Sequence, residues 1–347
     1  MSEKNDPVTI GLALGSGAAK GWAHIGVLNG LAKLGVFPDK VAGCSIGAVV
    51  GAAYSNDNLS ELEDWVRSFS SWDVLGLMDF SWRKGGLISG DKVFDVLQKS
   101  IGDLQIEQLK KPFAAVATDL YSGQEIWFTE GNLQQAVRAS CSMPGILSPV
   151  KMGDRWLVDG AVVNPVPVSV SKAMGVDIVI AVDLHGLRRG RMQVLPVNMK
   201  SNHPTTEEKA AESNQEEQGF TELLARGRDY ITGLTDKLSH KFDNSDAPNP
   251  GMLGVMNQSM DILEQRHKRA RLMGDPPDIC IVPDLARIGT MEFHRADEAI
   301  AAGEAAVEQV AHLINAALAP YQMRGEDPSK ASIEQDNASH PQGHSEV

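Results

Sequence analysis

The stretch VTIGLALGSGAAKGWAHIGVL, residues 8–28, runs from an apolar segment through a glycine cluster into a segment with helical spacing. Residues 8–14 have the composition of a buried strand. Large apolar side chains then recur over residues 18–34 at the spacing of one helix face, and Gly35 is a typical helix-ending glycine. The stretch therefore predicts a strand, a turn and a helix, which is the repeating unit of an α/β fold.

The same alternation continues along the chain. Residues 177–184 contain the apolar run IVIAV, which is typical of a parallel strand covered on both faces. Ser60 and Glu63 have the pattern of a capping box, which predicts that another helix starts at Ser60. We therefore expect an α/β fold with a mostly parallel sheet. The other expected strands are 40–44, 113–120, 124–129, 156–158 and 278–282, and the other expected helices are 46–54, 90–99, 133–141, 166–174, 252–273 and 293–318.

Composition divides the chain into four parts. We expect residues 8–185 to form the main domain and residues 186–250 to be a mobile insertion that carries an amphipathic helix. Residues 251–320 are expected to complete the main domain with helices and a strand, and residues 321–347 to be a disordered acidic tail. The formal charge of −13 disfavours nucleic-acid binding, because an acidic chain repels phosphates.

The cysteines and the apolar segments bear on the compartment. Cys44, Cys141 and Cys280 are too few and too scattered for a disulfide framework or a zinc site, which fits a reducing compartment. The N-terminal residues include acids and no long apolar run, and the most apolar stretch, 41–54, is too short to span a bilayer. We expect a protein that is cytoplasmic or peripheral on the inner face of a membrane and needs no metal or other cofactor.

Residues 43–47, Gly-Cys-Ser-Ile-Gly, match the pattern G-x-S-x-G at the point where a predicted strand meets a predicted helix. A sharp turn there lifts the hydroxyl of Ser45 above the sheet edge, and Gly43 and Gly47 leave room for the bend. The helix start also favours negative charge near Ser45. We interpret the motif as a nucleophile elbow; the alternative is a glycine-rich turn in which Ser45 only caps the helix.

The glycine cluster offers backbone amides to a ligand. The amides of Gly15, Ser16, Gly17 and Ala18 can converge on one point, as an oxyanion hole or a phosphate cradle. A dinucleotide-binding fingerprint would need a glycine where the chain has Lys20, and a P-loop would need a Gly-Lys-Ser/Thr sequence that is absent. Lys20 either positions this loop, meets an anionic head group or is a solvated lysine.

Asp159-Gly160-Ala161 is the candidate for the base that a serine nucleophile requires. A free aspartate has a pKa of about 3.9 and is a poor base, but it can accept a proton in a dry site. The alternative is a plain Asp-Gly turn. A histidine base is a further alternative: His185 follows Ser45 and Asp159 in the order of the α/β-hydrolases, but a charged mobile segment comes after it.

His24 lies on the first predicted helix within reach of the glycine loop. Its surroundings in the sequence are those of a core face, so we expect a hydrogen-bonded structural histidine that supports the loop.

Three pieces of the sequence, GSGAAKGWAHIGVL, GCSIG and WLVDGAVVNPVP, resemble in this order the patatin-like phospholipase family. The likeness is greatest to its bacterial branch related to neuropathy target esterase, including the RssA-type proteins. It implies a three-layer α/β/α sandwich with its catalytic core in residues 8–185. Ser45 resembles the family's nucleophile, Asp159 its base, and the amides around Gly17 and Ala18 its oxyanion hole. The implied activity is hydrolysis of an acyl ester in a phospholipid or lysophospholipid, through a Ser-Asp dyad and an acyl-enzyme.

The chain departs from the family in the glycine loop, where Ser16 and Ala18 replace glycines. A side chain there is costly if the backbone needs a positive φ. The altered loop is compatible with the alternative of a non-catalytic regulatory scaffold that keeps the hydrolase fold, whereas the intact Ser45 and Asp159 favour an enzyme. Residues 220–242 combine apolar and basic residues and are a candidate for contact with a membrane surface or for a lid; the alternative, which the acidic residues of the segment favour, is a helix packed on the main domain.

Overall fold

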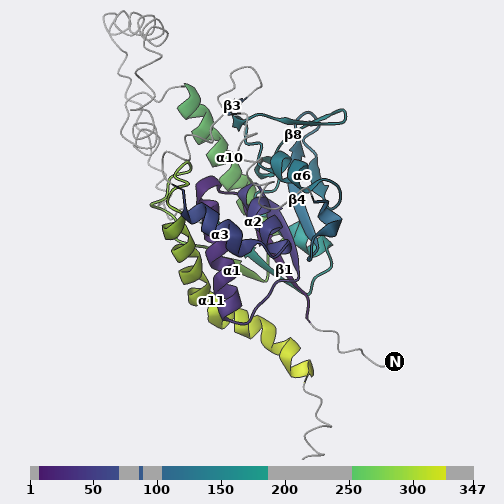
Figure 1. The fold of residues 1–347 in the computed structure, drawn as a ribbon, viewed down its shortest axis with the longest axis vertical. Coiled ribbons are helices and arrows are strands. Elements are labelled where there is room, and N and C mark those ends of the chain that lie inside the picture. The colour runs from purple at the N-terminus through teal and green to yellow at the C-terminus, as the bar shows by residue number, and fades with distance from the viewer. Residues whose placement is uncertain (1–7, 70–85, 89–103, 187–251, 326–347) are drawn as a thin grey trace, which may run out of the picture. The chain divides into compact units, whose positions relative to one another are not determined.

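The computed structural model describes residues 8–69, 86–88, 104–186 and 252–325 (Figure 1). Contacts divide the chain into two units, residues 1–186 with 259–347 and residues 187–258. The site discussed below lies in the first unit. The helix expected at 90–99 and the membrane-contacting helix expected at 220–242 lie outside the described residues.

Eight strands of the described residues form one sheet in the order β10-β9-β1-β2-β4-β8-β7, with β5 paired to β4. Neighbours among β10, β9, β1, β2 and β4 are parallel, whereas β5, β8 and β7 pair antiparallel. The strands are β1 (Ile10–Leu14), β2 (Lys40–Cys44), β4 (Phe113–Asp119), β5 (Glu125–Phe128), β7 (Val150–Met152), β8 (Arg155–Asp159), β9 (Ile178–Val182) and β10 (Ile279–Ile281). A second, two-stranded sheet pairs β3 (Gly86–Ile88) with β6 (Gly145–Leu147).

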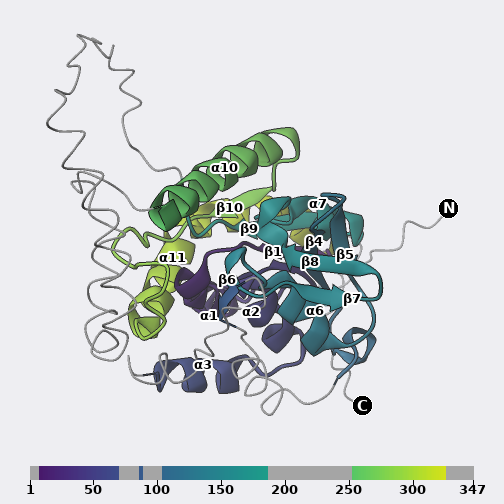
Figure 2. The same cartoon turned by 90° about the horizontal axis from the view of Figure 1, so that it is seen from above.

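Helices cover both faces of the large sheet, as Figure 2 shows. One face carries α1, α2, α3, α6 and α11, and the other carries α7 and α10. The α-helices are α1 (Ala23–Lys33), α2 (Ile46–Ser55), α3 (Leu59–Arg67), α6 (Leu133–Ser140), α7 (Val168–Ala173), α10 (Met252–Gly274) and α11 (Ala296–Gly325). Short 3₁₀ helices span Ala18–Trp22, Ile106–Gln108 and Gly160–Val162. The expected three-layer α/β/α sandwich with a mostly parallel sheet is confirmed.

The burial of the strands explains why the sheet forms where the sequence indicates. Every residue of β1 and β9 is buried, because both faces of the central sheet are covered. Helices α1 and α11 pack closely because both carry glycines at their contact. A Cβ on Gly26 would lie 1.8 Å from the carbonyl oxygen of Ile300, and one on Gly303 would lie 2.1 Å from that of Ala23. Only glycine fits at these two positions.

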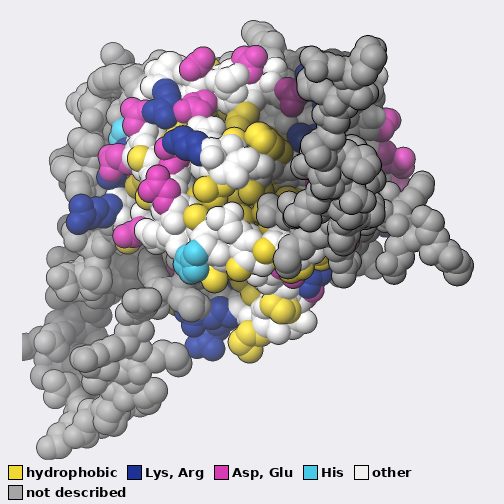
Figure 3. All heavy atoms as spheres, turned by 90° about the horizontal axis from the view of Figure 1, so that it is seen from below, with side chains coloured by type: hydrophobic (Ala, Val, Ile, Leu, Met, Phe, Trp, Pro, Cys, Tyr) yellow, Lys and Arg dark blue, Asp and Glu magenta, His cyan; other side chains and the backbone are white. Residues whose placement is uncertain are grey.

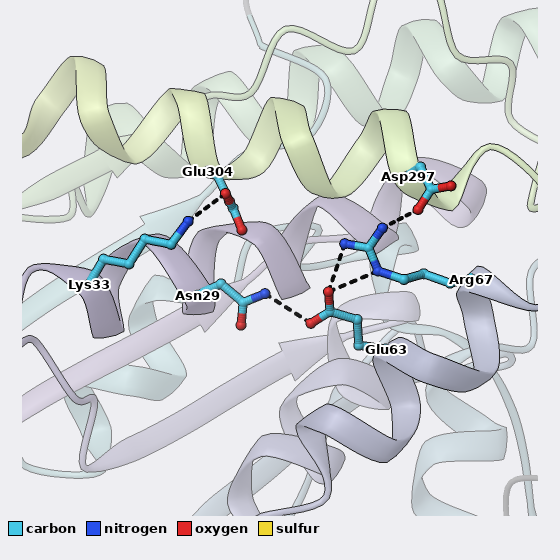
Figure 4. A network of polar contacts seen from close by, with 6 residues as sticks. All are labelled: Asn29, Lys33, Glu63, Arg67, Asp297 and Glu304. Atoms are coloured by element: carbon cyan, nitrogen blue, oxygen red, sulfur yellow. Dashed lines mark hydrogen bonds and ion pairs between the residues drawn. The ribbon is translucent and has the colours of Figure 1, made fainter.

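The predicted capping box is wrong. Ser60 lies inside α3, whose N-cap is Asn58, and its hydroxyl donates to Glu61. Glu63 instead accepts from Asn29 of α1 at 2.9 Å and pairs with Arg67 at 2.7 Å (Figure 4).

The network of Figure 4 joins α1, α3 and α11 at the surface. Arg67 also pairs with Asp297 of α11, and Lys33 of α1 pairs with Glu304 of α11 at 2.7 Å. Because exposed ion pairs of this kind contribute about 0–1 kcal/mol each, apolar packing dominates the contact between these helices.

The surface of the described residues mixes both signs of charge. Figure 3 shows one face on which acidic and basic side chains are interspersed around a group of hydrophobic ones. Across the described ranges, no helix is both long enough and apolar enough to cross a bilayer.

Candidate active site

The pairing of β4 brings Ser45 and Asp159 together. Val116 of β4 pairs with Cys44, and the next residue, Ala117, pairs with Asp159. Because β5 occupies the other edge of β4 over the same residues, β2 and β8 must share one edge. Strand β8 therefore begins its pairing where β2 stops, and the residue after Cys44 lies beside Asp159.

The hydroxyl of Ser45 donates a hydrogen bond to Oδ2 of Asp159 at 2.6 Å. Both side chains are buried, with 5% of Ser45 and 1% of Asp159 exposed. A direct contact at this distance leaves no room for an imidazole between the two groups. The predicted pair is thus in contact, and neither His24 nor His185 hydrogen-bonds to Asp159 within the described part of the chain.

The backbone at Ser45 is strained, as the predicted nucleophile elbow requires. Ser45 has φ 55° and ψ −125°, a conformation that L-residues rarely adopt. Gly43 and Gly47 are predicted to leave room for the bend, and backbone atoms do lie too close to both residues for a side chain. A Cβ on Gly43 would lie 2.5 Å from the Cα of Ala48, and one on Gly47 would lie 2.2 Å from the carbonyl oxygen of Leu14.

Ser140 of α6 connects the Ser45 turn to strand β4 through two hydrogen bonds. The Ser45 amide donates to Oγ of Ser140 at 2.9 Å, and the Ser140 hydroxyl donates to the carbonyl of Val116 at 2.6 Å. Ser140 is fully buried. Sequence reasoning missed this residue, since nothing in the pattern of residues 133–141 marks Ser140 as the partner of a distant turn.

The motif Asp159-Gly160-Ala161 orients the carboxylate. Asp159 caps a 3₁₀ helix, so that the Ala161 amide donates to its Oδ1 at 2.8 Å and leaves Oδ2 for Ser45. A Cβ on Gly160 would lie 2.3 Å from the carbonyl oxygen of Val116, which explains the glycine.

Burial changes the acidity of Asp159. It raises the pKa of this carboxyl from 3.8 to about 7, although the hydrogen bonds from Ser45 and Ala161 oppose the shift. The negative charge of Glu264 adds to the increase. Asp159 is therefore a much stronger base than a carboxylate in water.

The glycine loop lies directly against the elbow. A Cβ on Gly21 would meet Ile46, and one on Gly47 would come within 2.8 Å of the carbonyl oxygen of Gly15. Two of the four predicted oxyanion amides have backbone acceptors: Gly15 donates to Val182 at 3.1 Å and Ser16 to Pro165 at 2.8 Å.

The next two amides of the loop, those of Gly17 and Ala18, donate to no acceptor among the described residues. Ala18 has φ 48°, so this position does require a left-handed backbone, and its Cβ costs about 1–2 kcal/mol. The Ser16 position has no such requirement.

His24 supports the glycine loop from α1. Its side chain is fully buried, and burial lowers its pKa to about 4. The neutral ring places Nε2 at 2.8 Å from the Gly15 carbonyl, to which Nε2–H donates. Lys20 is half-buried. Burial lowers the pKa of His185 to about 4, and the positive charges of Lys20 and Lys268 add to this decrease.

Helix α10 places charged side chains next to the glycine loop and the end of β9, which the sequence did not indicate. Ser16 Oγ donates to Oε1 of Glu264 at 2.7 Å. Lys268 pairs with Asp183 at 2.7 Å, and both side chains are buried. In the described ranges, no group of three His, Cys, Asp or Glu side chains is arranged to hold a metal ion.

Comparison with known proteins places this geometry in a family. Residues 12–171 match the family model described as patatin-like phospholipase. An uncharacterized NTE family protein of Mycobacterium tuberculosis is 31% identical over 350 residues, which cover 94% of this chain and 95% of that one. The chain belongs to the patatin-like phospholipase family. The matched range contains Ser45, Asp159 and the glycine loop.

Two animal proteins are similar over about half of this chain. Neuropathy target esterase sws of Drosophila melanogaster is 32% identical over 183 residues, which are 51% of this chain and 13% of that protein. Patatin-like phospholipase domain-containing protein 7 of Rattus norvegicus is 32% identical over 182 residues, 50% of this chain and 13% of that protein. The family resemblance seen in the sequence is confirmed.

Proposed function

We propose that this member of the patatin-like phospholipase family hydrolyses an acyl ester in a phospholipid or lysophospholipid, with Ser45 as nucleophile and Asp159 as base. The observation that carries the proposal is the 2.6 Å hydrogen bond from the strained Ser45 to the buried Asp159. The relatives of the chain also support the proposal, because they include a protein named as an esterase and one named as a phospholipase domain protein.

The geometry supports a two-step reaction. Asp159 accepts the hydroxyl proton as Ser45 Oγ attacks the ester carbonyl, and the developing oxyanion is stabilised by the amides of Gly17 and Ala18. The ester bond then breaks, the alcohol leaves with the proton from Asp159, and the acyl group remains on Ser45. A water molecule gives a proton to Asp159 and attacks the acyl-enzyme, which releases the fatty acid and returns the proton to Ser45.

The acidity of Asp159 makes this base effective without a histidine. A pKa of about 7 leaves the carboxyl largely ionised in weakly alkaline solution and yet about 3 units more basic than a free aspartate. A general base works best when its pKa lies near the working pH.

A fluorophosphonate probe tests the nucleophile. We expect the probe to label the wild type and Ser55→Ala, a matched change of a buried serine on α2, but not Ser45→Ala. Turnover of a p-nitrophenyl ester should vanish in Ser45→Ala and Asp159→Asn while both variants stay folded. Equal labelling of wild type and Ser45→Ala contradicts the assignment, and a wild type without Ser45-dependent turnover favours a non-catalytic scaffold.

The substrate class requires a separate experiment. Wild type and Ser45→Ala are incubated with a total lipid extract, and the lipids that disappear only with the wild type identify the head group and acyl position. The proposed membrane contact of residues 220–242 predicts that their deletion abolishes vesicle binding and leaves soluble-ester turnover intact. Unchanged vesicle binding would remove that part of the proposal.

A further inference from the structure

Ser16 replaces a glycine of the family pattern, and its side chain has a specific partner. Only 3% of the residue is exposed, and its hydroxyl donates to Oε1 of Glu264 at 2.7 Å. The two residues are 248 positions apart, so the contact depends on the tertiary fold. A hydroxyl buried without an acceptor costs about 1–3 kcal/mol, so Ser16 requires an acceptor at this place.

The same bond adds to the restraints on the loop just before the amides of Gly17 and Ala18, which have no acceptor among the described residues. The Gly15 amide donates to Val182, and the Gly15 carbonyl accepts from His24. The Ser16 amide donates to Pro165. The contact with Glu264 then fixes the side chain of Ser16 as well. Since the peptide that follows contains the Gly17 amide, the direction of that amide depends on how firmly Ser16 is held.

Glu264 is itself held in place by the anchoring of α10. One turn further along the helix, Lys268 forms a buried ion pair with Asp183, which follows β9. At the end of the helix, Arg271 pairs with Glu125 at 3.2 Å. Burial raises the pKa of Glu264, so its carboxyl occupies an unfavourable place for a charge. A carboxyl without a specific partner would be more stable in solvent, so the burial of Glu264 indicates that its contact with Ser16 is specific.

We propose that Glu264 is a positioning residue for the reaction, because through Ser16 it aims the amides of Gly17 and Ala18 at the oxygen of the reacting carbonyl. The proposal rests on the proposed function, since it assigns those amides to the oxyanion. It also gives a physical role to a buried serine in a loop otherwise rich in glycine and alanine, since the side chain of Ser16 is bonded to α10.

Three variants test the positioning with a soluble p-nitrophenyl ester. Loss of a complete oxyanion donor costs about 10²–10³ in kcat, so misdirected amides in Glu264→Ala and Ser16→Gly should lower kcat by about 10- to 100-fold. KM should stay within about twofold, because the amides act mainly in the transition state. Glu264→Gln should stay within about threefold of the wild type, since its amide oxygen still accepts from Ser16.

A double-mutant cycle separates positioning from general damage. If the two side chains act only through their mutual bond, Ser16→Gly/Glu264→Ala should be no slower than the slower single variant. Glu308→Gln, an exposed change of the same chemistry on α11, is the matched control and should behave as the wild type. Independent, multiplicative losses in the cycle would overturn the proposal, as would an unchanged kcat in Ser16→Gly.

Hydrogen exchange keeps this test independent of turnover. The amides of residues 15–20 should exchange faster in Glu264→Ala and Ser16→Gly than in Glu264→Gln or Glu308→Gln. Unchanged exchange in both of the first two variants would refute the contact as a restraint. If Ser45-dependent turnover is absent in the wild type while exchange changes as expected, the proposed function fails and the restraint on the loop stands. If Glu264→Ala does not fold, Ser16→Gly removes the same bond without altering α10.

Discussion

The buried carboxylate of Asp159 should make the protein less stable above about pH 7, where the group is ionised. Replacement by asparagine removes the charge and keeps most of the hydrogen bonding, because Oδ1 still accepts from Ala161 and the amide can donate to Ser45. The pKa rises from 3.8 to about 7 on folding. At about 1.4 kcal/mol per pKa unit, Asp159→Asn should raise the free energy of unfolding above pH 7 by up to about 4 kcal/mol.

The sign of the pH dependence follows from the direction of the shift. Between about pH 4 and pH 7, Asp159 is protonated in the folded protein and ionised in the unfolded chain. The unfolded state therefore binds fewer protons, and the group's contribution to stability falls by about 1.4 kcal/mol per pH unit. This contribution is fully present below about pH 4 and is lost as the pH rises through about 7, above which the difference between wild type and Asp159→Asn is constant.

Urea unfolding of wild type and Asp159→Asn at several pH values between 4 and 9 measures this difference. We expect the two curves of stability against pH to diverge between about pH 4 and pH 7 and to run parallel above it, with Asp159→Asn the more stable protein. Asp64→Asn, a change of an exposed aspartate on α3, should follow the wild type throughout. Curves that stay parallel from pH 4 to pH 9 would show that the Asp159 carboxylate is not desolvated. The argument that Asp159 is an effective base would then fail.

Three further outcomes follow from the same site. In the proposed mechanism Asp159 must be ionised to accept the proton of Ser45, so kcat/KM should fall about tenfold per pH unit below about pH 7 and level off above it, as a pH–rate profile with a soluble ester can measure. Ala18→Gly should relieve the strain of φ 48° and stabilise the protein by about 1 kcal/mol in urea unfolding, without loss of kcat. Ser140→Ala leaves the elbow amide and a strand carbonyl unpaired and should cost about 2–4 kcal/mol, whereas Ser55→Ala removes a buried hydroxyl that has no partner among the described residues and should be nearly neutral.

The α/β class and the site motifs were predictable because they depend on local chemistry. A strand buried on both faces must be apolar throughout, as β1 and β9 are, and each is followed by turn residues of a recognisable kind. The elbow glycines were recognisable because no side chain fits where the chain of 43–47 turns against the first strand. The helix end at Gly35, with φ 73°, follows from the same freedom of glycine.

Features set by distant partners could not be predicted in this way. The capping-box pattern of Ser60 and Glu63 failed because Glu63 finds better partners on neighbouring segments and Asn58 takes the N-cap position. The strands at 145–147 and 150–152 were missed, since three residues are too few to show a period. Strand β8 brings Asp159 beside Ser45 only because it pairs antiparallel with the end of β4, on the same edge as β2 and just beyond the residues that β2 occupies, and no local pattern encodes that choice.

The cost of the site is itself an argument about function. Ser45 and Ala18 hold left-handed backbone conformations, and such residues cost about 1–3 kcal/mol each. The desolvated Asp159 adds up to about 4 kcal/mol above pH 7. Together these are a large part of the 5–15 kcal/mol, roughly, by which a domain is stable. A non-catalytic scaffold could avoid these three destabilising features with glycine at positions 45 and 18 and asparagine at position 159, and it would keep the same sheet. Ester hydrolysis needs a hydroxyl bonded to a base, directed amides and a basic carboxylate at once, so the combination favours turnover over a binding role alone.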